Sequence, residues 1–202
     1  MQGILFVEHL FRLVINGVKT ETRRTGALDK LINKNPGIWG VANECVDEYL
    51  EFKFNNLFSS SEWISPRYRP GEIVFLKEPY TKEGLYKYDF TTAAPARDMA
   101  KWKNKMFMPH HMARYFIQII NVRVERIKDI TSESAIKEGI YKNSLADRGY
   151  THPYYLGPTT FDSSIEAFKD LFCTVNYKKQ SGLKAWINND WVFVYEFKLH
   201  KP

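Results

Sequence analysis

Cysteine is scarce in this sequence, and long apolar runs are missing. The two cysteines, Cys45 and Cys173, lie far apart and outside any Cys-x-x-Cys pattern. Two thiols cannot supply the four ligands of a structural zinc site, and they suggest no disulfide framework. No apolar stretch approaches the roughly 18 to 20 residues of a membrane-spanning helix. We therefore expect no structural metal, no membrane partner, reduced thiols and a cytoplasmic location.

Several motifs that mark common enzyme classes are also missing. We find no Gly-rich phosphate loop, no Gly-x-Gly-x-x-Gly fingerprint and no Ser-His-Asp arrangement, and we expect no cofactor. His110 and His111 have no carboxylate at metal-ligand spacing, so we expect them on a surface loop. The N-terminus lacks a basic region and Glu8 interrupts its apolar run, which argues against a signal peptide.

The totals are those of a globular protein with a basic surface. At 202 residues, the chain is long enough for one large domain with a substantial core. Its formal net charge of +6 permits a nucleic-acid or phosphate-bearing partner without requiring one. Aromatic residues make up 15% of the chain, and they are candidates for core packing or for stacking on bases.

A dense group of polar residues follows the first apolar segment, at positions 17–24. Apolar residues at helical spacing end at Asn16-Gly17, where glycine can take a positive φ. Residues 20–24 then alternate as on a strand, with hydroxyls and guanidiniums close together. The pattern is typical of a functional site, although a strand with one solvated face has the same pattern.

This stretch resembles the Gly-x-Lys-x-x-[Thr/Glu]-x-Arg signature of the ASCH family, a branch of the PUA-like β-barrels, through Gly17, Lys19, Thr22 and Arg24. The resemblance continues through the Pro70-Gly71 turn and the apolar strand ending at Glu78, although Glu72 stands where Asp is usual. Further matching blocks are Pro109 with Arg114, residues 122–139 and residues 191–198. The chain is most similar to the longer ASCH proteins often found in phages and prophages.

The resemblance implies an α+β fold: a PUA-like mixed β-barrel with flanking helices, formed by a single domain over residues 1–202. We expect insertions at 27–68, 79–112 and 141–160, the second of which is a candidate flap. The apolar pattern predicts strands over 72–78, 115–126 and 191–199. It predicts helices before Gly17, over 131–138, and after the Ser163/Glu166 capping box.

The family also implies a chemistry. Some short bacterial ASCH proteins are amidohydrolases that deacetylate N4-acetylcytidine with a Lys, a Thr and a Glu. The resemblance places these roles on Lys19 as base, Thr22 as nucleophile and Glu138 as acid or orienting group, with Glu133 as a competing carboxylate. Residues 19 and 22 would face opposite sides of a regular strand, so the turn after Gly17 must keep Lys19 outside the strand.

Binding without catalysis is the leading prediction. Lys19, Arg23 and Arg24 would then form a phosphate-contacting patch on RNA or a nucleotide. Glu78 is a candidate partner of Arg24 in this cleft. Arg114 and Trp39 are further candidates for binding, the latter by stacking. Lys101, Trp102, Lys103 and Lys105 interleave an aromatic residue with cations, as in single-strand grooves or in a solvated charge run. A phage-associated structural or interaction protein is a third possibility.

Overall fold

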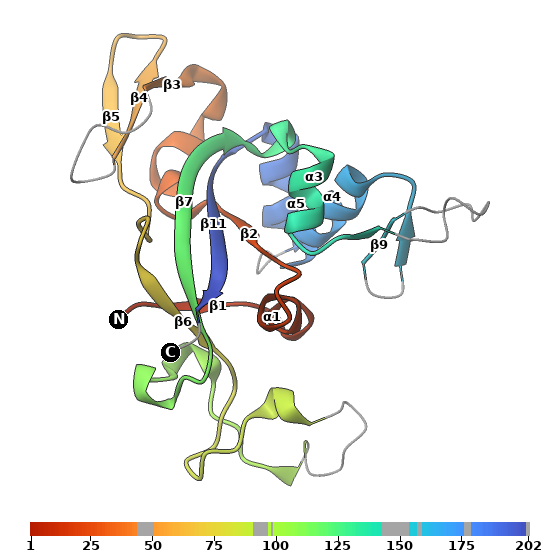
Figure 1. Ribbon diagram of the computed structural model, residues 1–202. Helices are drawn as coiled ribbons and strands as arrows, with labels where there is room; N and C mark the ends of the chain where they lie inside the picture. The colour runs from red at the N-terminus through yellow and green to blue at the C-terminus, as the bar shows by residue number, and fades with distance from the viewer. Residues whose placement is uncertain are drawn as a thin grey trace.

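The computed structural model describes residues 1–43, 51–90, 97, 99–142, 154–156, 159–175 and 179–200. Its centre is a five-stranded sheet in the order β1 (Gly3–Leu5), β6 (Ile73–Lys77), β7 (Phe116–Arg126), β11 (Trp191–His200) and β2 (Glu21–Arg24) (Figure 1). β1 runs parallel to β6, and the other neighbours are antiparallel. The predicted α+β class is confirmed. Among the described residues, no strand pairing links β1 to β2, so these strands form no closed barrel.

The long pair β7 and β11 holds the core together. Both strands are rich in the β-branched and aromatic residues that favour a pleated, buried surface. Residues 192–195 of β11 are at most 1% exposed, so both faces of this strand are covered. A register shift between Glu196 and Phe197 marks a bulge, which bends the strand. The strands predicted over 72–78, 115–126 and 191–199 are confirmed as β6, β7 and β11.

The helices α1 (Glu8–Ile15), α3 (Ser132–Lys137) and α4 (Ser164–Val175) match the predicted helical segments. The Glu166 amide donates to Ser163 Oγ at 3.1 Å, which confirms the expected cap of α4. The predictions missed α5 (Lys179–Asn188), which lacks a pronounced apolar face. Figure 1 shows α3, α4 and α5 gathered on one side of the central sheet, and α4 packs against both of its neighbours.

Two smaller sheets lie outside the central one. The first contains β3 (Trp39–Asn43), β4 (Phe52–Asn56) and β5 (Ser61–Ile64), and the second contains β8 (Tyr141–Lys142), β9 (Tyr154–Leu156) and β10 (Thr159–Phe161). Short 3-10 helices are η1 (Gly26–Lys30), η2 (Ile32–Lys34), η3 (Pro36–Ile38), η5 (Lys87–Asp89), η6 (Lys105–Phe107), η7 (His110–Met112) and η8 (Ile127–Asp129). In Figure 1 the β3–β5 sheet and the segment around η5–η7 lie at opposite ends of the molecule.

The predicted insertions are only partly described. Residues 44–50 of the first, 91–96 and 98 of the second, and 143–153 and 157–158 of the third lie outside the described residues. Leu28, Ile32 and Phe54 from the first segment are fully buried and belong to the same hydrophobic core as the central sheet. In the part of the chain that the structure describes, no helix is both long and apolar enough to cross a membrane.

Candidate functional site

The turn after α1 determines how the polar motif is presented. Gly17 adopts a φ of 72°, and the amides of Val18 and Lys19 both donate to the Leu13 carbonyl, at 2.9 and 3.1 Å. This tight turn delays the start of β2 until Glu21. Lys19 is therefore outside the regular strand, as predicted, and its side chain lines the same pocket as Thr22.

Lys19 and Glu138 form a buried ion pair. The Lys19 ammonium donates to the Glu138 carboxylate and, at 2.7 Å, to the Glu138 backbone carbonyl. The two residues are only 1% and 4% exposed. Desolvation lowers the pKa of the Lys19 amine, the Glu138 carboxylate opposes this shift, and Arg24 and Arg23 lower the pKa further.

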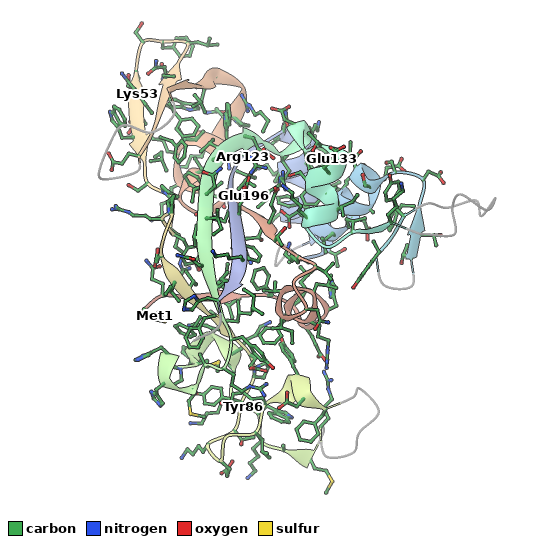
Figure 2. The ribbon with its side chains drawn as sticks, viewed as in Figure 1. Met1, Lys53, Tyr86, Arg123, Glu133 and Glu196 are labelled. Carbon is green, nitrogen blue, oxygen red and sulfur yellow. The ribbon has the colours of Figure 1, made fainter. Side chains whose placement is uncertain are left out.

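The two predicted carboxylates, Glu138 and Glu133, occupy different positions on the short helix α3. Glu138 is the C-cap residue of α3, and Gly139 follows with a φ of 104°, a conformation that reverses the chain. Glu133 lies in the first turn of the same helix and is exposed, and Figure 2 shows it on the outer side of the molecule. Of the two predicted carboxylates, only Glu138 pairs with Lys19 and lines the same pocket as Thr22.

Arg23 is a structural partner of Glu138 within this site. Its Nη1 donates to Glu138 Oε1 at 3.2 Å, its Nη2 to Ser134 Oγ at 2.8 Å, and its Nε to Glu125 Oε1 at 2.8 Å. The Arg23 side chain has no exposed surface. Because its donors are bound to these partners, Arg23 orients the carboxylate that holds Lys19.

The charged network continues across the sheet in a way that the sequence reasoning missed. Glu21 accepts from Ser134 Oγ, from Arg123 Nη2 at 3.1 Å and from Lys137 Nζ at 3.2 Å. Arg123 also pairs with Glu196 on the neighbouring strand, and Figure 2 shows these two side chains next to each other. The signal was available, because Arg123 and Glu125 alternate with Val122 and Val124 on a strand rich in apolar residues.

Thr22 faces a small pocket with a volume of about 60 Å³. The polar part of its wall combines Lys19, Thr22 and Glu138 with Arg23 and Arg24. The apolar part comes from α1, from Phe6 and from one face of α4, through Leu10, Phe168, Leu171, Phe172 and Val175. The structure thus brings all three predicted catalytic residues to one enclosed space. Pockets for drug-sized ligands have volumes of about 300 to 1,000 Å³, so this space does not hold a whole nucleoside.

Arg24 lies between this small pocket and a much larger one. Its Nη2 donates to the Leu5 carbonyl at 2.7 Å, and its guanidinium lies over the Phe6 ring at 5.3 Å. Since Leu5 ends β1, one side chain links the two outermost strands of the central sheet. Burial lowers the pKa of Arg24, but a guanidinium remains a cation in proteins.

The large pocket has a volume of about 650 Å³. Its lining includes Arg24, Lys30, Arg67 and Lys77, and it contains no Asp or Glu. Among the described residues, none of these four cations forms an ion pair. Other arginines do have carboxylate partners: Arg12, Arg23, Arg97, Arg114 and Arg123. The large pocket therefore concentrates uncompensated positive charge.

Two tyrosines form a fixed wall of the large pocket. The Tyr68 hydroxyl donates to the Gly3 carbonyl at 3.0 Å, and the Tyr195 hydroxyl accepts from the Arg67 amide at 3.0 Å. Their rings pack edge to face, with centroids 5.4 Å apart. Burial raises the pKa of Tyr195 to about 12, so its phenol stays neutral. The wall beside the four cations is thus preorganised and carries no negative charge.

Three other predicted binding residues lie outside both pockets. Glu78 is fully buried and pairs with Arg114, at 2.9 and 3.1 Å, instead of with Arg24. Arg114 also binds Asp89 and stacks on the Tyr86 ring at 3.7 Å. Burial raises the pKa of the Glu78 carboxyl, against the effect of Arg114.

Trp39 is 8% exposed on β3 and packs in the hydrophobic core, away from a position for stacking on a ligand. His110 and His111 are exposed on η7. The described residues contain no group of three or more potential metal ligands. No protein-family model matches this chain, and neither curated proteins nor solved structures give a match.

Proposed function

We propose that this protein binds RNA or a nucleotide in the large pocket. The observation that carries the proposal is the set of four cations without carboxylate partners, in a pocket of nucleotide size. Lysine and arginine are the usual ligands of phosphate oxygens, and the electrostatic attraction is strongest where no acidic side chain competes.

The proposal includes an ASCH-type, PUA-like identity for the domain. Its support is the sequence motif, whose last residue, Arg24, lines the large pocket from an outer strand of the central sheet. The motif residues Lys19 and Thr22, and Arg23 between Thr22 and Arg24, are buried, so we assign direct ligand contact to Arg24.

Titration of a fluorescent RNA and of AMP at several salt concentrations tests this function. We expect affinity to fall steeply with salt, because bound phosphates release counterions. The double variant Lys30→Ala/Arg67→Ala should bind more weakly and show a shallower salt dependence; both side chains are exposed, so the fold should survive. The control Lys142→Ala/Lys169→Ala removes the same charge away from the pocket. Equal losses of ligand affinity in the two double variants, or no binding by the intact protein, would refute the proposal.

A second candidate is an amidohydrolase acting on N4-acetylcytidine or a related acylated nucleoside. The observation that favours it is the meeting of Lys19, Thr22 and Glu138 in the small pocket, although the chain separates them by up to 119 residues. The small pocket has room for an acyl group, and the remainder of the substrate would have to lie outside it.

The chemistry requires a neutral amine at Lys19. Burial and the two neighbouring arginines favour this form, while Glu138 favours the ammonium. Neutral Lys19 would take the Thr22 hydroxyl proton as the oxygen attacks the acyl carbonyl, giving an acyl-threonine once the C–N bond breaks. The leaving amine would receive a proton from Lys19 or Glu138, and water would then hydrolyse the ester.

Hydrolysis of N4-acetylcytidine by the purified protein tests this candidate. Thr22→Ala should abolish turnover, whereas Thr20→Ala, a matched change outside the small pocket, should preserve it. Equal turnover by these two variants would exclude Thr22 as the nucleophile. A folded protein with neither turnover nor ligand binding would point to a structural or interaction role.

A further inference from the structure

An exposed aromatic side chain without a role in the function proposed above directly follows a lining residue of the large pocket in the chain. Met106 lines the pocket, and Phe107 follows it at the end of η6. Met106 is 56% exposed and Phe107 is 77% exposed. An exposed aromatic ring that adjoins a pocket residue in the chain is a candidate for stacking on a nucleic-acid base.

The backbone beneath Phe107 is firmly held. Lys77 Nζ donates to the Met106 carbonyl at 2.7 Å, and the Asn104 side chain accepts from the Met106 amide at 2.9 Å. Lys105 Nζ donates to the Phe6 carbonyl at 2.6 Å, which ties η6 to the chain just after β1. Lys105 and Met106, immediately before Phe107, are therefore tied to Phe6 and to β6, so little backbone ordering is needed for Phe107 to contact a ligand.

Phe107 differs in this respect from the aromatic residue that the sequence pattern suggested. Trp102 donates its indole N–H to the Arg97 carbonyl and packs edge to face on Phe90, with centroids 5.8 Å apart. Lys105, one of the interleaved cations, is likewise held by backbone and phenol oxygens. In this segment the aromatic face open to a ligand belongs to Phe107.

We infer that the ligand of the large pocket is a single-stranded nucleic acid that continues beyond the pocket and stacks a base on Phe107. This inference rests on the proposed function. A mononucleotide fits within 650 Å³ and has no further base for Phe107. A single-stranded nucleic acid offers a phosphate for Lys77, which lines the pocket and contacts Met106. It also offers a further unpaired base that can stack on Phe107.

Binding of AMP, a hexameric RNA and the DNA of the same sequence tests the inference. Both oligonucleotides should bind more tightly than AMP. Comparison of the RNA with the DNA shows which sugar is preferred. Phe107→Ala should weaken strand binding about tenfold while leaving AMP affinity unchanged. Phe58→Ala is a closely matched control, because Phe58 is 75% exposed on the turn between β4 and β5 and lies outside the pocket.

The outcomes separate this inference from the proposed function. AMP binding that depends on Lys30 and Arg67, with no effect of Phe107→Ala on strand binding, would overturn the inference and leave the proposed function intact. Equal effects of Phe107→Ala and Phe58→Ala on strand affinity would overturn it as well. Absence of binding for all three probes would overturn both. Circular dichroism checks that each variant is folded.

Discussion

Lys19 and Glu138 lie 119 residues apart in the chain and form a buried ion pair at the centre of the candidate site. The pair joins the segment before β2 to the end of α3. Arg23 binds the second oxygen of the same carboxylate at 3.2 Å. The motif on β2 therefore maintains the geometry of the small pocket, whatever reaction or ligand that pocket serves.

We expect Lys19→Met to lower the free energy of unfolding by about 3 to 5 kcal/mol, because it leaves a buried carboxylate without its ammonium partner. The double variant Lys19→Met/Glu138→Gln should lose less than the sum of the single changes, since it removes both charges. Urea denaturation of the parent protein, the two single variants and the double variant measures this coupling. Strict additivity would show that the pair contributes nothing beyond its separate side chains.

Replacing Arg24 should affect both stability and binding. Arg24→Met keeps most of the side-chain length but removes the hydrogen bond to Leu5, so we expect a loss of about 1.5 to 3 kcal/mol. It should also weaken RNA binding, whereas Arg67→Met should weaken binding with little change in stability, because Arg67 is exposed. Thermal unfolding and RNA titration of both variants give the comparison. Identical behaviour of the two would contradict the bridging role of Arg24.

Asp190, immediately before β11, should make stability depend on pH. It is 7% exposed, its Oδ1 has no hydrogen-bond partner among the described residues, and burial raises its pKa from 3.8 to about 6. A raised carboxyl pKa means that the folded state holds the proton more tightly than the unfolded state. Stability is therefore lost as the pH rises from about 4 through 6.

The variant Asp190→Asn should remove this contribution. We expect it to be more stable than the parent protein by about 1 to 3 kcal/mol at pH 8 and nearly equal to it at pH 4. Thermal unfolding at these two pH values measures the difference. A gain that is the same at both would show that ionisation of Asp190 is not its cause.

A side chain at position 139 should destabilise the fold. Its φ of 104° disfavours L residues, and an added Cβ would lie 2.8 Å from Leu13 Cδ1. We expect Gly139→Ala to cost more than 1 kcal/mol and to disturb the adjacent Glu138. Gly26→Ala is the control, because Gly26 also has a positive φ but its Cβ would meet open space. Urea denaturation should place Gly139→Ala clearly below Gly26→Ala in stability.

The elements that could be predicted are those whose signal is local. The apolar residues of β7 and β11, the cap of α4 and the turn at Gly17 are all visible within short windows of sequence. Lys19, Thr22 and Glu138 came from a family resemblance, and the structure brings them into one pocket. Helix α5 was missed because its polar sequence carries weak periodicity.

The large pocket could not be read from the sequence. Its cations come from β2, η1, the loop before β6 and the end of β6, so only the tertiary fold brings them together. The pairing of Glu78 with Arg114, and the burial of Trp39, likewise depend on tertiary packing that no short pattern encodes. Sequence patterns identify charged residues, but they do not show which charges remain unpaired after folding.

Because Arg24 lines both pockets, the two spaces share one positive charge. That charge is among the causes that lower the pKa of Lys19. An anion bound to Arg24 in the large pocket would offset part of this effect and so favour a proton on Lys19. If the large pocket binds an anionic ligand as proposed, ligand binding on one side of the guanidinium and proton uptake on the other would be thermodynamically linked, and each would strengthen the other by the same factor.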